Sequence, residues 1–288
     1  MTVRLSKLHG LGNDFLIHLT DDVTALDEPD LWSGWARRWC DRQRGIGADG
    51  LILGVRGQEV ADLVMVLHNA DGSRAEMSGN GIRCLAHAEA RRREQPEGRV
   101  VVATDGGRRV VDHRPDPGGD PLTLVSSVDM GAPKPGPVPN RPERKIGLGP
   151  KPTADAIECH AVSPRHTVTI DLGNPHLVLL VDDPAGVDIG RAGPGHEAAY
   201  HDGINVHVVA STTEEADAIT MATWERGVGV TQACGTGAAA AALAANQWGL
   251  VGTHVTVHMP GGDVTVEVGE TLTLHGPSVH IADIEVAP

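Results

Sequence analysis

Short apolar runs recur along the whole chain and predict a protein built mainly from β-strands. The runs either alternate apolar and polar positions or consist of Val, Leu and Ile, as strands do. In the first half they cover residues 3–8, 15–19, 51–55 and 61–68. After a run at 122–128, the second half repeats this rhythm at residues 166–172, 177–181, 205–210, 218–224, 254–258, 263–268, 271–275 and 279–284.

Three segments have helical spacing. Residues 82–94 and 236–247 each follow a Gly-x-Gly turn and predict one strong helix in each half of the chain. Residues 30–43 carry tryptophans three and four positions apart, a stripe that is typical of core packing rather than of a cofactor site. These tryptophans are Trp32, Trp35 and Trp39.

Two short signatures occur twice at almost the same separation. Ser78 in Ser-Gly-Asn-Gly returns 156 residues later as Cys234 in Cys-Gly-Thr-Gly, and the Gly-Asn pair at Asn13 returns 161 residues later at Asn174. Two independent signatures at one offset indicate a duplicated domain. Duplicated halves can face each other across a cleft, which offers one acid/base group to each face of a substrate carbon.

We therefore expect an α/β (α+β) protein of two pseudo-symmetric lobes. The N-terminal lobe is predicted to cover residues 1–118 and the C-terminal lobe residues 119–275, with a last strand at 276–288 that returns to the N-terminal lobe. Ten of the 19 prolines fall between Pro115 and Pro152, which predicts an irregular surface connection between the halves.

The composition, with 40% hydrophobic and 22% charged residues, is that of a globular protein. A formal net charge of −14 argues against a general nucleic-acid binder, which needs a basic face. No apolar stretch is long enough to span a membrane, and the first residues read as a strand rather than a signal peptide. Four dispersed cysteines without CxxC spacing indicate reduced thiols in a cytoplasmic protein: Cys40, Cys84, Cys159 and Cys234.

The two Gly-x-Gly helix starts are candidate anion sites. A helix N-terminus exposes unpaired N–H groups and the positive end of the dipole, and glycine lets a ligand approach closely. Two opposed termini, at Gly79 and Gly235, could hold one carboxylate. The same field is expected to lower the pKa of Cys234 and make it a thiolate. Ordinary helix caps are the alternative, and the repetition together with the cysteine favours function.

Several polar residues suit an amino-acid pocket. Glu225-Arg226 ends a strand and could bind the ammonium and carboxylate of a zwitterion, although a surface ion pair is the alternative. Asparagine is common in turns for backbone reasons, yet such a pocket needs neutral groups that fix orientation. The candidate asparagines are Asn13, Asn69, Asn80, Asn174 and Asn205.

Other motifs do not meet their structural requirements. Residues 45–50 match GxGxxG, but a strand follows where a dinucleotide site requires a helix. The fifteen histidines form no HExxH or Cys/His cluster, and no lysine suggests a pyridoxal site. The sequence therefore predicts no metal and no cofactor.

At these residues the chain resembles the diaminopimelate epimerases, which are cofactor-independent amino-acid epimerases. The resemblance implies two similar lobes, each a curved mixed sheet around a central helix, that close on substrate; we also expect a homodimer. It spans nearly the whole chain. Its signatures are Lys7-Leu-His-Gly-Leu-Gly-Asn-Asp-Phe15, Asn69-Ala-Asp-Gly-Ser73, Ser78-Gly-Asn-Gly81, Gly173-Asn-Pro-His176, Glu225-Arg226 and Ala233-Cys-Gly-Thr-Gly237.

The resemblance also implies residue roles. Cys234 and the residue at position 78 match the two catalytic acid/bases, and His176 and Glu225 match positions that tune them. Backbone at Gly79, Asn80, Gly235 and Thr236 would hold the α-carboxylate. Side chains that would contact substrate are Asn13, Asn69, Asn174, Asn205, Glu225 and Arg226.

One position departs from the family where chemistry depends on it. Ser78 stands in place of a catalytic cysteine, and Cys84, six residues on inside the helix, is not a substitute. A hydroxyl is far less acidic than a thiol, whose reference pKa is about 8.5, so Ser78 would be a poor base and a poor proton donor. An engineered replacement, a natural variant that works with help, and altered chemistry such as elimination with one thiol all remain open.

The sequence thus predicts an isomerase that interconverts LL- and meso-2,6-diaminopimelate by two-base proton transfer without pyridoxal phosphate, in lysine and peptidoglycan precursor synthesis. A related amino-acid racemase or a one-thiol dehydratase is the enzyme alternative. A catalytically dead amino-acid-binding protein that keeps the pocket is the alternative outside enzymes.

Overall fold

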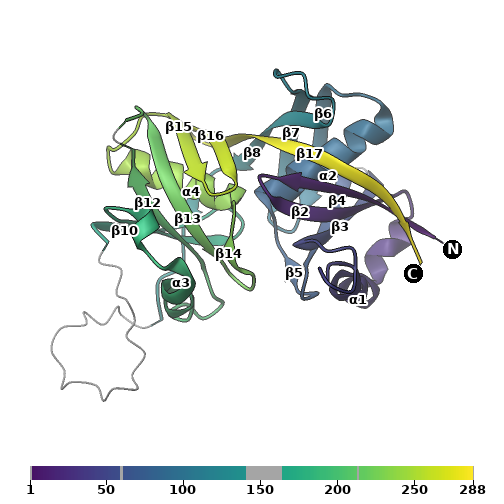
Figure 1. Cartoon of the computed structure of the whole chain (residues 1–288), viewed down its shortest axis with the longest axis horizontal. Helices are drawn as coiled ribbons and strands as arrows, with labels where there is room; N and C mark the ends of the chain where they lie inside the picture. Colours follow the sequence, from purple (N-terminus) through teal and green to yellow (C-terminus); the bar gives the residue numbers. More distant parts are fainter. Residues whose placement is uncertain (1, 59–60, 141–163, 213, 288) are drawn as a thin grey trace, which may run out of the picture.

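Two lobes lie side by side in the computed structural model, which describes residues 2–58, 61–140, 164–212 and 214–287. Figure 1 shows the N-terminal lobe in purple to blue and the C-terminal lobe in green to yellow, with two long strands running between them. Cys159 and residues 141–152, the last part of the proline-rich connection, lie outside the described residues. No helix in the described ranges is long and apolar enough to cross a membrane.

The N-terminal lobe is a sheet wrapped around one helix. Its helices are the 3₁₀ helix η1 (Val23–Asp27), α1 (Pro29–Trp39) and α2 (Gly79–Arg93). Its strands are β1 (Val3–Gly10), β2 (Asn13–Thr20), β3 (Gly50–Gln58), β4 (Ala61–Asn69), β5 (Arg74–Ala75), β6 (Gly98–Thr104), β7 (Gly107–Pro115) and β8 (Thr123–Gly131).

The C-terminal lobe repeats this plan. Its helices are the 3₁₀ helix η2 (Pro184–Gly186), α3 (Ile189–Glu197) and α4 (Gly235–Gln247). Its strands are β9 (Lys134–Pro135), β10 (His166–Asp171), β11 (Pro175–Leu180), β12 (Asn205–Ser211), β13 (Ala218–Glu225), β14 (Gly229–Thr231), β15 (His254–Met259), β16 (Gly262–Val268) and β17 (Leu272–Val286).

The strand pairings repeat element by element. The parallel pairs β2–β3 and β4–β6 correspond to the parallel pairs β11–β12 and β13–β15, and the neighbouring pairs are antiparallel in both lobes. In the N-terminal lobe the sequence β17–β1–β2–β3–β4–β6–β7–β8 closes into a ring because β8 pairs with β17. The predicted class, α/β (α+β) with two repeated lobes, is confirmed.

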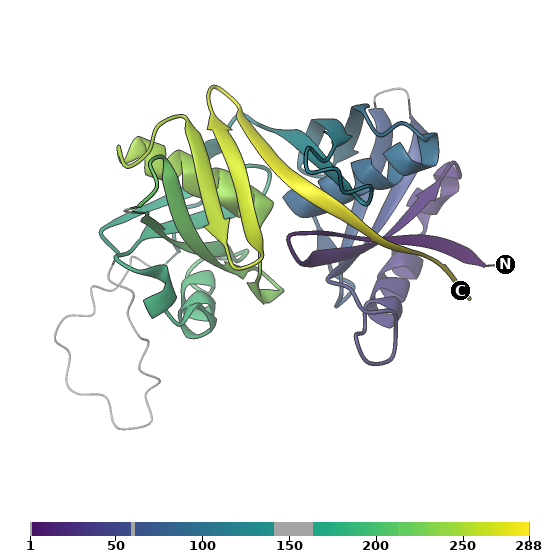
Figure 2. The same cartoon turned by 45° about the horizontal axis from the view of Figure 1, so that its top comes forward.

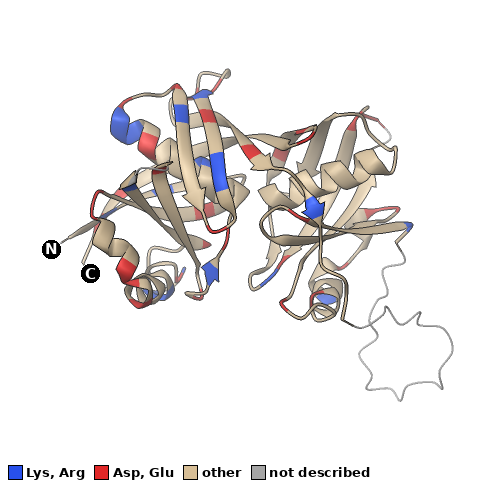
Figure 3. Ribbon diagram, turned by 180° about the vertical axis from the view of Figure 1, so that it is seen from behind, with Lys and Arg blue, Asp and Glu red and all other residues tan. Residues whose placement is uncertain are grey.

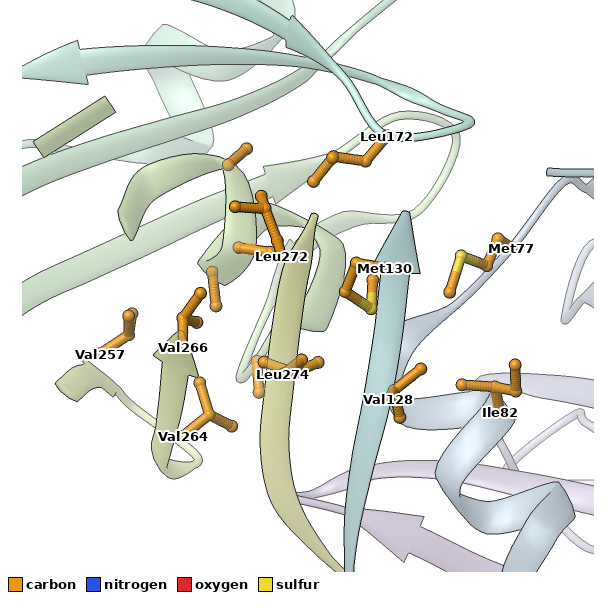
Figure 4. Packing of buried hydrophobic residues seen from close by; sticks show 14 of the residues in the cluster. Met77, Ile82, Val128, Met130, Leu172, Val257, Val264, Val266, Leu272 and Leu274 are labelled. Atoms are coloured by element: carbon orange, nitrogen blue, oxygen red, sulfur yellow. The ribbon is translucent and has the colours of Figure 1, made fainter. Parts of the chain in front are cut away.

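Strands β8 and β17 pair with each other along the junction and join the lobes (Figure 2). The first residues of β17 pair with β16, while residues 279–286 pair with β1 of the N-terminal lobe. We propose to divide the chain near residue 118 and near residue 276, which assigns β8 to the C-terminal lobe by sequence although it also closes the ring of the N-terminal lobe. Figure 4 shows Leu274 of β17 and Val128 of β8 within a single apolar cluster that extends through both lobes.

Each lobe encloses one helix and carries another outside. In α4 every residue from Gly235 to Ala245 is buried, and the helix carries no charged residue. Charged residues are scattered over the rest of both lobes (Figure 3). The outer helix α1 contributes the tryptophan stripe to its own cluster, which confirms the packing role of Trp32 and Trp39. The outer helix α3 covers the opposite lobe in the same way.

Some sequence-based boundaries are wrong. The segments 271–275 and 279–284 form one strand, β17, because pairing with β8 continues through Gly276 and Pro277. Strands β6 and β7 and helix α3 were not expected; α3 contains three glycines and Pro194, so packing rather than helix propensity maintains it. Helix α1 ends at Trp39, not at residue 43.

Candidate active site

A cavity of about 360 Å³ lies between the lobes. Residues from β2, β4, β5 and the loop before α2 face residues from the turn before β11, from β12 and from the end of β13 with the loop after it. Of the residues singled out in the sequence, seven line this cavity: Asn13, Asn69, Ser78, Asn174, Asn205, Glu225 and Arg226. The others lie directly behind the lining, and they are Gly79, Asn80, His176, Cys234, Gly235 and Thr236.

The two Gly-x-Gly helix starts meet backbone to backbone. A Cβ placed on Gly79 would lie 3.0 Å from the Cα of Gly235, and a Cβ on Gly235 would lie 3.0 Å from the Cα of Gly79. Both glycines are the first residues of their helices, so the positive ends of two helix dipoles converge here. Only glycine permits this approach, which brings two sets of unpaired N–H groups to one place.

A fully buried arginine supports this junction from behind. Arg83 donates from Nη1 to the Gly79 carbonyl at 3.1 Å and from Nη2 to Asn80 Oδ1 at 2.7 Å. Burial lowers the pKa of Arg83 to about 10. Asn80 in turn donates to the Ala233 carbonyl at 3.0 Å, which ties the first turn of α2 to the opposite lobe.

Ser78 is the N-cap of α2. Its Oγ accepts a hydrogen bond from the Gly81 N–H at 3.1 Å, which satisfies one of the unpaired N–H groups of the helix start. Within the described residues, no side-chain base is hydrogen-bonded to this hydroxyl. Cys84, one turn further into α2, is fully buried, and burial raises its pKa to about 12, so it lies outside the cavity chemistry.

Cys234 is the N-cap of α4 and is buried, with Sγ 3.6 Å from the Thr236 hydroxyl. The expectation that the helix start lowers its pKa is wrong. Burial raises the pKa of the thiol well above its ordinary value, and the nearby Glu225 carboxylate raises it further. The Thr236 hydroxyl and the Gly237 N–H act in the opposite direction but do not outweigh these effects.

Glu225 and Arg226 lie at the end of β13 and face different partners. Glu225 accepts from the Thr231 hydroxyl at 2.6 Å, and burial raises its pKa. Arg226 Nη2 lies 2.8 and 3.0 Å from the two carboxylate oxygens of Glu76 in the N-terminal lobe. The backbone N–H of Arg226 donates to Asn205 Oδ1 at 3.0 Å, which fixes the strand end.

His176 is enclosed behind Asn174. Its Nε2 lies 2.9 Å from Asn174 Oδ1 and its Nδ1 lies 2.9 Å from His207 Nε2, so both ring nitrogens are occupied. Asn174 also donates from Nδ2 to the Thr236 hydroxyl at 3.3 Å. Burial and the charge of Arg226 lower the pKa of His176 well below its ordinary value, and the ring is neutral.

The remaining asparagines are held by local contacts. Asn13 Nδ2 donates to Asp49 at 2.9 Å, Asn69 Nδ2 donates to the Ser73 hydroxyl at 3.0 Å, and Asn205 Nδ2 donates to a backbone carbonyl. These bonds orient amide groups at the cavity wall.

Sequence reasoning missed Asp49, Glu76, Arg83 and His207. Glu76 directly precedes Met77-Ser78, and His207 lies two residues after Asn205, on the same face of a strand. Their closeness to the signature residues could have indicated them. Arg83 lies in the helix next to the Ser-Gly-Asn-Gly signature, but no spacing rule predicts that an arginine at this place is fully buried.

Comparison with known proteins settles the family. A family model described as diaminopimelate epimerase matches residues 5–134 and 168–278. The chain belongs to the diaminopimelate epimerase family. Diaminopimelate epimerase of Moorella thermoacetica is 38% identical over 282 residues, covering 96% of each chain. That of Synechococcus elongatus is 35% identical, covering 98% of this chain and 97% of the relative. The predicted enzyme class, an amino-acid-epimerising isomerase, is confirmed.

Solved structures share the fold at low identity. A hydroxyproline epimerase from Agrobacterium vitis superposes with a TM-score of 0.69 at 15% identity, covering 99% of this chain and 92% of that one. A phenazine biosynthesis protein of the PhzF family from Bacillus anthracis gives 0.69 at 15% identity with full coverage of both chains. These likenesses establish the two-lobed fold alone.

Proposed function

We propose that this protein epimerises 2,6-diaminopimelate without pyridoxal phosphate, with Cys234 as the acid/base on one face of the reacting carbon. The observation that carries the proposal is the meeting of Gly79 and Gly235 beside a polar cavity, with Cys234 at the head of one helix. Family membership supplies the substrate class.

The substrate α-carboxylate is bound by backbone N–H groups of Gly79, Asn80, Gly235 and Thr236. Two converging helix starts favour an anion there, and the charge of the buried Arg83 adds to this preference. The distal amino-acid end is bound by the cavity wall, where Arg226 matches the charge of a carboxylate. The neutral side chains that fix its orientation are Asn13, Asn69, Asn174 and Asn205.

Proton removal is assigned to the Cys234–Glu225 pair. The thiol gives its proton to the Glu225 carboxylate, and the resulting thiolate takes the Hα of the substrate, leaving a carbanion beside the converging N–H groups. A raised thiol pKa makes the thiolate a stronger base once formed. Reprotonation from the opposite face completes the inversion.

The opposite face is served by position 78, where this chain has a serine hydroxyl in place of a thiol. The Ser78 hydroxyl caps α2, and among the described residues no side-chain base is hydrogen-bonded to it. His176 cannot substitute, because both its nitrogens are engaged by Asn174 and His207. Proton delivery from this face is therefore slow. We expect weak net inversion by the chain as it stands.

The test is a pair of measurements on the intact protein with LL- and meso-diaminopimelate. Chiral chromatography follows net conversion, and mass spectrometry in deuterated water follows exchange of Hα at each stereocentre. We expect exchange of one stereocentre to outpace inversion. Absence of exchange from both stereoisomers, with the substrate bound, would contradict the assignment of Cys234.

The unaided Ser78 favours a second candidate, a one-thiol elimination. In that reaction Cys234 removes Hα and a leaving group departs from the adjacent carbon with the electron pair, so no second proton is needed. An amino acid carrying a β-leaving group would be converted to a keto acid and ammonia after hydrolysis of the enamine. Keto-acid release without Hα exchange of diaminopimelate would favour this candidate.

A further inference from the structure

A continuous chain of buried hydrogen bonds runs from β13 to the sulfur of Cys234. Thr223 Oγ1 lies 3.1 Å from His207 Nδ1, and His207 Nε2 lies 2.9 Å from His176 Nδ1. The chain continues from His176 Nε2 through Asn174 and the Thr236 hydroxyl to Cys234 Sγ. All six side chains are buried, with at most 9% of any residue exposed.

The N-terminal lobe shows that the fold does not require this chain of hydrogen bonds. His207 opposes Thr223 in the β12–β13 pair as Ile52 opposes Leu67 in the β3–β4 pair. His176 follows its Gly-Asn signature at the position where Phe15 follows the first one, and the two occupy equivalent places in the β11–β12 and β2–β3 pairs. The corresponding residues of the N-terminal lobe, Phe15, Ile52 and Leu67, are apolar and buried.

The polar set is therefore present only behind the helix that carries a thiol at its start. Burying polar groups is unfavourable unless each is hydrogen-bonded, and an apolar set fills the same space in the other lobe. Gly237 makes room for the set, since a Cβ there would overlap the ring of His207. In the N-terminal lobe the equivalent glycine, Gly81, packs against Ile52 and Met65.

We propose that His207 and Thr223 are positioning residues of a one-directional hydrogen-bond chain that stabilises the Cys234 thiolate. A thiolate has no proton, so the Thr236 hydroxyl must donate to Sγ and accept from the Asn174 amide. Asn174 Oδ1 then accepts from His176 Nε2–H, and His176 Nδ1 accepts from His207 Nε2–H. His207 Nδ1 is then an acceptor, and the Thr223 hydroxyl donates a hydrogen bond to it.

Each link therefore donates toward the sulfur, and no proton is transferred along the chain. Both rings must be neutral, because an imidazolium has no acceptor nitrogen and would interrupt the sequence. Burial keeps His207 neutral by lowering its pKa to about 3. Burial, the neighbouring His207 and the charge of Arg226 act in the same direction on His176.

The proposal rests on the proposed acid/base role of Cys234, but its direct test needs no substrate. Nitrogen-15 spectra of histidine-labelled protein report the protonation of each ring nitrogen, and signals lost in His176→Gln and His207→Gln assign the two rings. We expect both rings to be neutral with the proton on Nε2 at alkaline pH, where Cys234 is ionised. A proton on Nδ1 of either ring, or an imidazolium, under these conditions overturns the proposal.

The second test measures thiolate stability directly. The alkylation rate of the Cys234 peptide by iodoacetamide is followed by mass spectrometry across pH for the unchanged protein, Thr223→Val and Thr223→Ser. Loss of one net hydrogen bond corresponds to about a two- to tenfold smaller thiolate fraction at fixed pH. We expect this fall, seen as a titration midpoint at higher pH, in Thr223→Val and not in Thr223→Ser.

A purely structural role gives a different pattern. Thr223→Val is close to isosteric, so it would then leave the alkylation midpoint unchanged while lowering the unfolding midpoint, and this outcome overturns the proposal. Epimerisation can be present when the tautomers are wrong, and tautomers can be right when epimerisation is absent. The experiments therefore distinguish failure of the proposed hydrogen-bond chain from failure of the proposed function.

Discussion

Gly79 and Gly235 contact each other across the two lobes. A Cβ atom added to either glycine would lie 3.0 Å from the Cα atom of the other. The Cδ2 atom of Leu274 lies almost as close to both positions, at 3.2 Å and 3.0 Å, so the contact has no free side. The two helix starts therefore share one rigid junction, and the geometry of the anion site depends on their separation.

Adding one methyl group at this junction should separate the helices. For Gly235→Ala or Gly79→Ala we expect a loss of about 1–3 kcal/mol in the free energy of unfolding, the usual cost of overpacking. Weaker carboxylate binding should accompany it, because the N–H groups no longer converge. Urea denaturation and calorimetry with diaminopimelate measure the two effects.

Gly34→Ala is the matched control. Gly34 lies in α1 with nothing within 4 Å of its would-be Cβ, so alanine should stabilise that helix by up to about 1 kcal/mol and leave binding unchanged. Equal losses of binding in the control and at the junction would contradict the proposed carboxylate site.

Restoring a thiol at position 78 should raise epimerisation strongly. A positioned acid/base contributes roughly 10²–10⁴-fold, and Ser78→Cys changes one atom at an N-cap that already faces the cavity. The rate of LL-to-meso conversion by chiral chromatography measures the gain. Cys234→Ser in the same background should abolish it, because each thiol serves one face.

The gain should also depend on His207, a proposed positioning residue of the hydrogen-bond chain behind Cys234. His207→Ile, which copies Ile52 of the other lobe, removes a link of that chain, so we expect a smaller gain in the Ser78→Cys background. A folded Ser78→Cys protein that binds substrate but gains no activity would contradict the diaminopimelate epimerase proposal.

The sequence predicted the parts of the fold that carry periodic or repeated signals. The two Gly-x-Gly helix starts and the 156-residue offset gave the duplicated lobes and the facing termini. Helix α3 was missed because Gly193 and Pro194 disfavour helix, and its stability comes from packing of Gly193 against Trp224.

The site was predicted by residue type but not by electrostatics. A helix start suggested a low pKa for Cys234, yet burial and Glu225 dominate, and neither is visible in local sequence. Likewise the His207–His176 contact joins residues 31 positions apart on parallel strands, so only strand pairing reveals it.

Buried neutral histidines should make the protein sensitive to acid. His87 in α2 lies 3.1 Å from the Ser278 carbonyl, and burial and Arg91 lower its pKa from 6.5 to about 4. Between these values the unfolded chain binds the proton and the folded chain does not, so stability present above pH 6.5 is lost as the pH falls. His207 adds to the loss down to about pH 3.

The His87→Gln variant tests this dependence. At about 1.4 kcal/mol per pH unit, the contribution of His87 amounts to roughly 3 kcal/mol, so the variant should lose that much less stability on acidification. Urea denaturation at several pH values measures the slope. An unchanged slope in His87→Gln would refute the argument.

The ion pair between Glu76 and Arg226 should compete with substrate. Arg226 is the proposed partner of a substrate carboxylate, and in the unliganded chain the Glu76 carboxylate occupies it from the opposite lobe. Glu76→Gln keeps the side-chain shape and removes the competing charge. The pair is partly exposed, and such pairs contribute about 0.2–1 kcal/mol, so we expect binding to tighten by no more than about fivefold.

Calorimetric titration of diaminopimelate into the Ser78 protein, in which we expect net inversion to be slow, measures this effect. Added salt screens the ion pair, so the advantage of Glu76→Gln should shrink as ionic strength rises. Asp112→Asn, which breaks the exposed ion pair with Arg99 on β6 and β7 away from the cavity, should leave binding unchanged. Weaker binding in Glu76→Gln would show instead that Glu76 contacts the substrate, since removing a ligand-binding carboxylate costs affinity that removing a competitor does not.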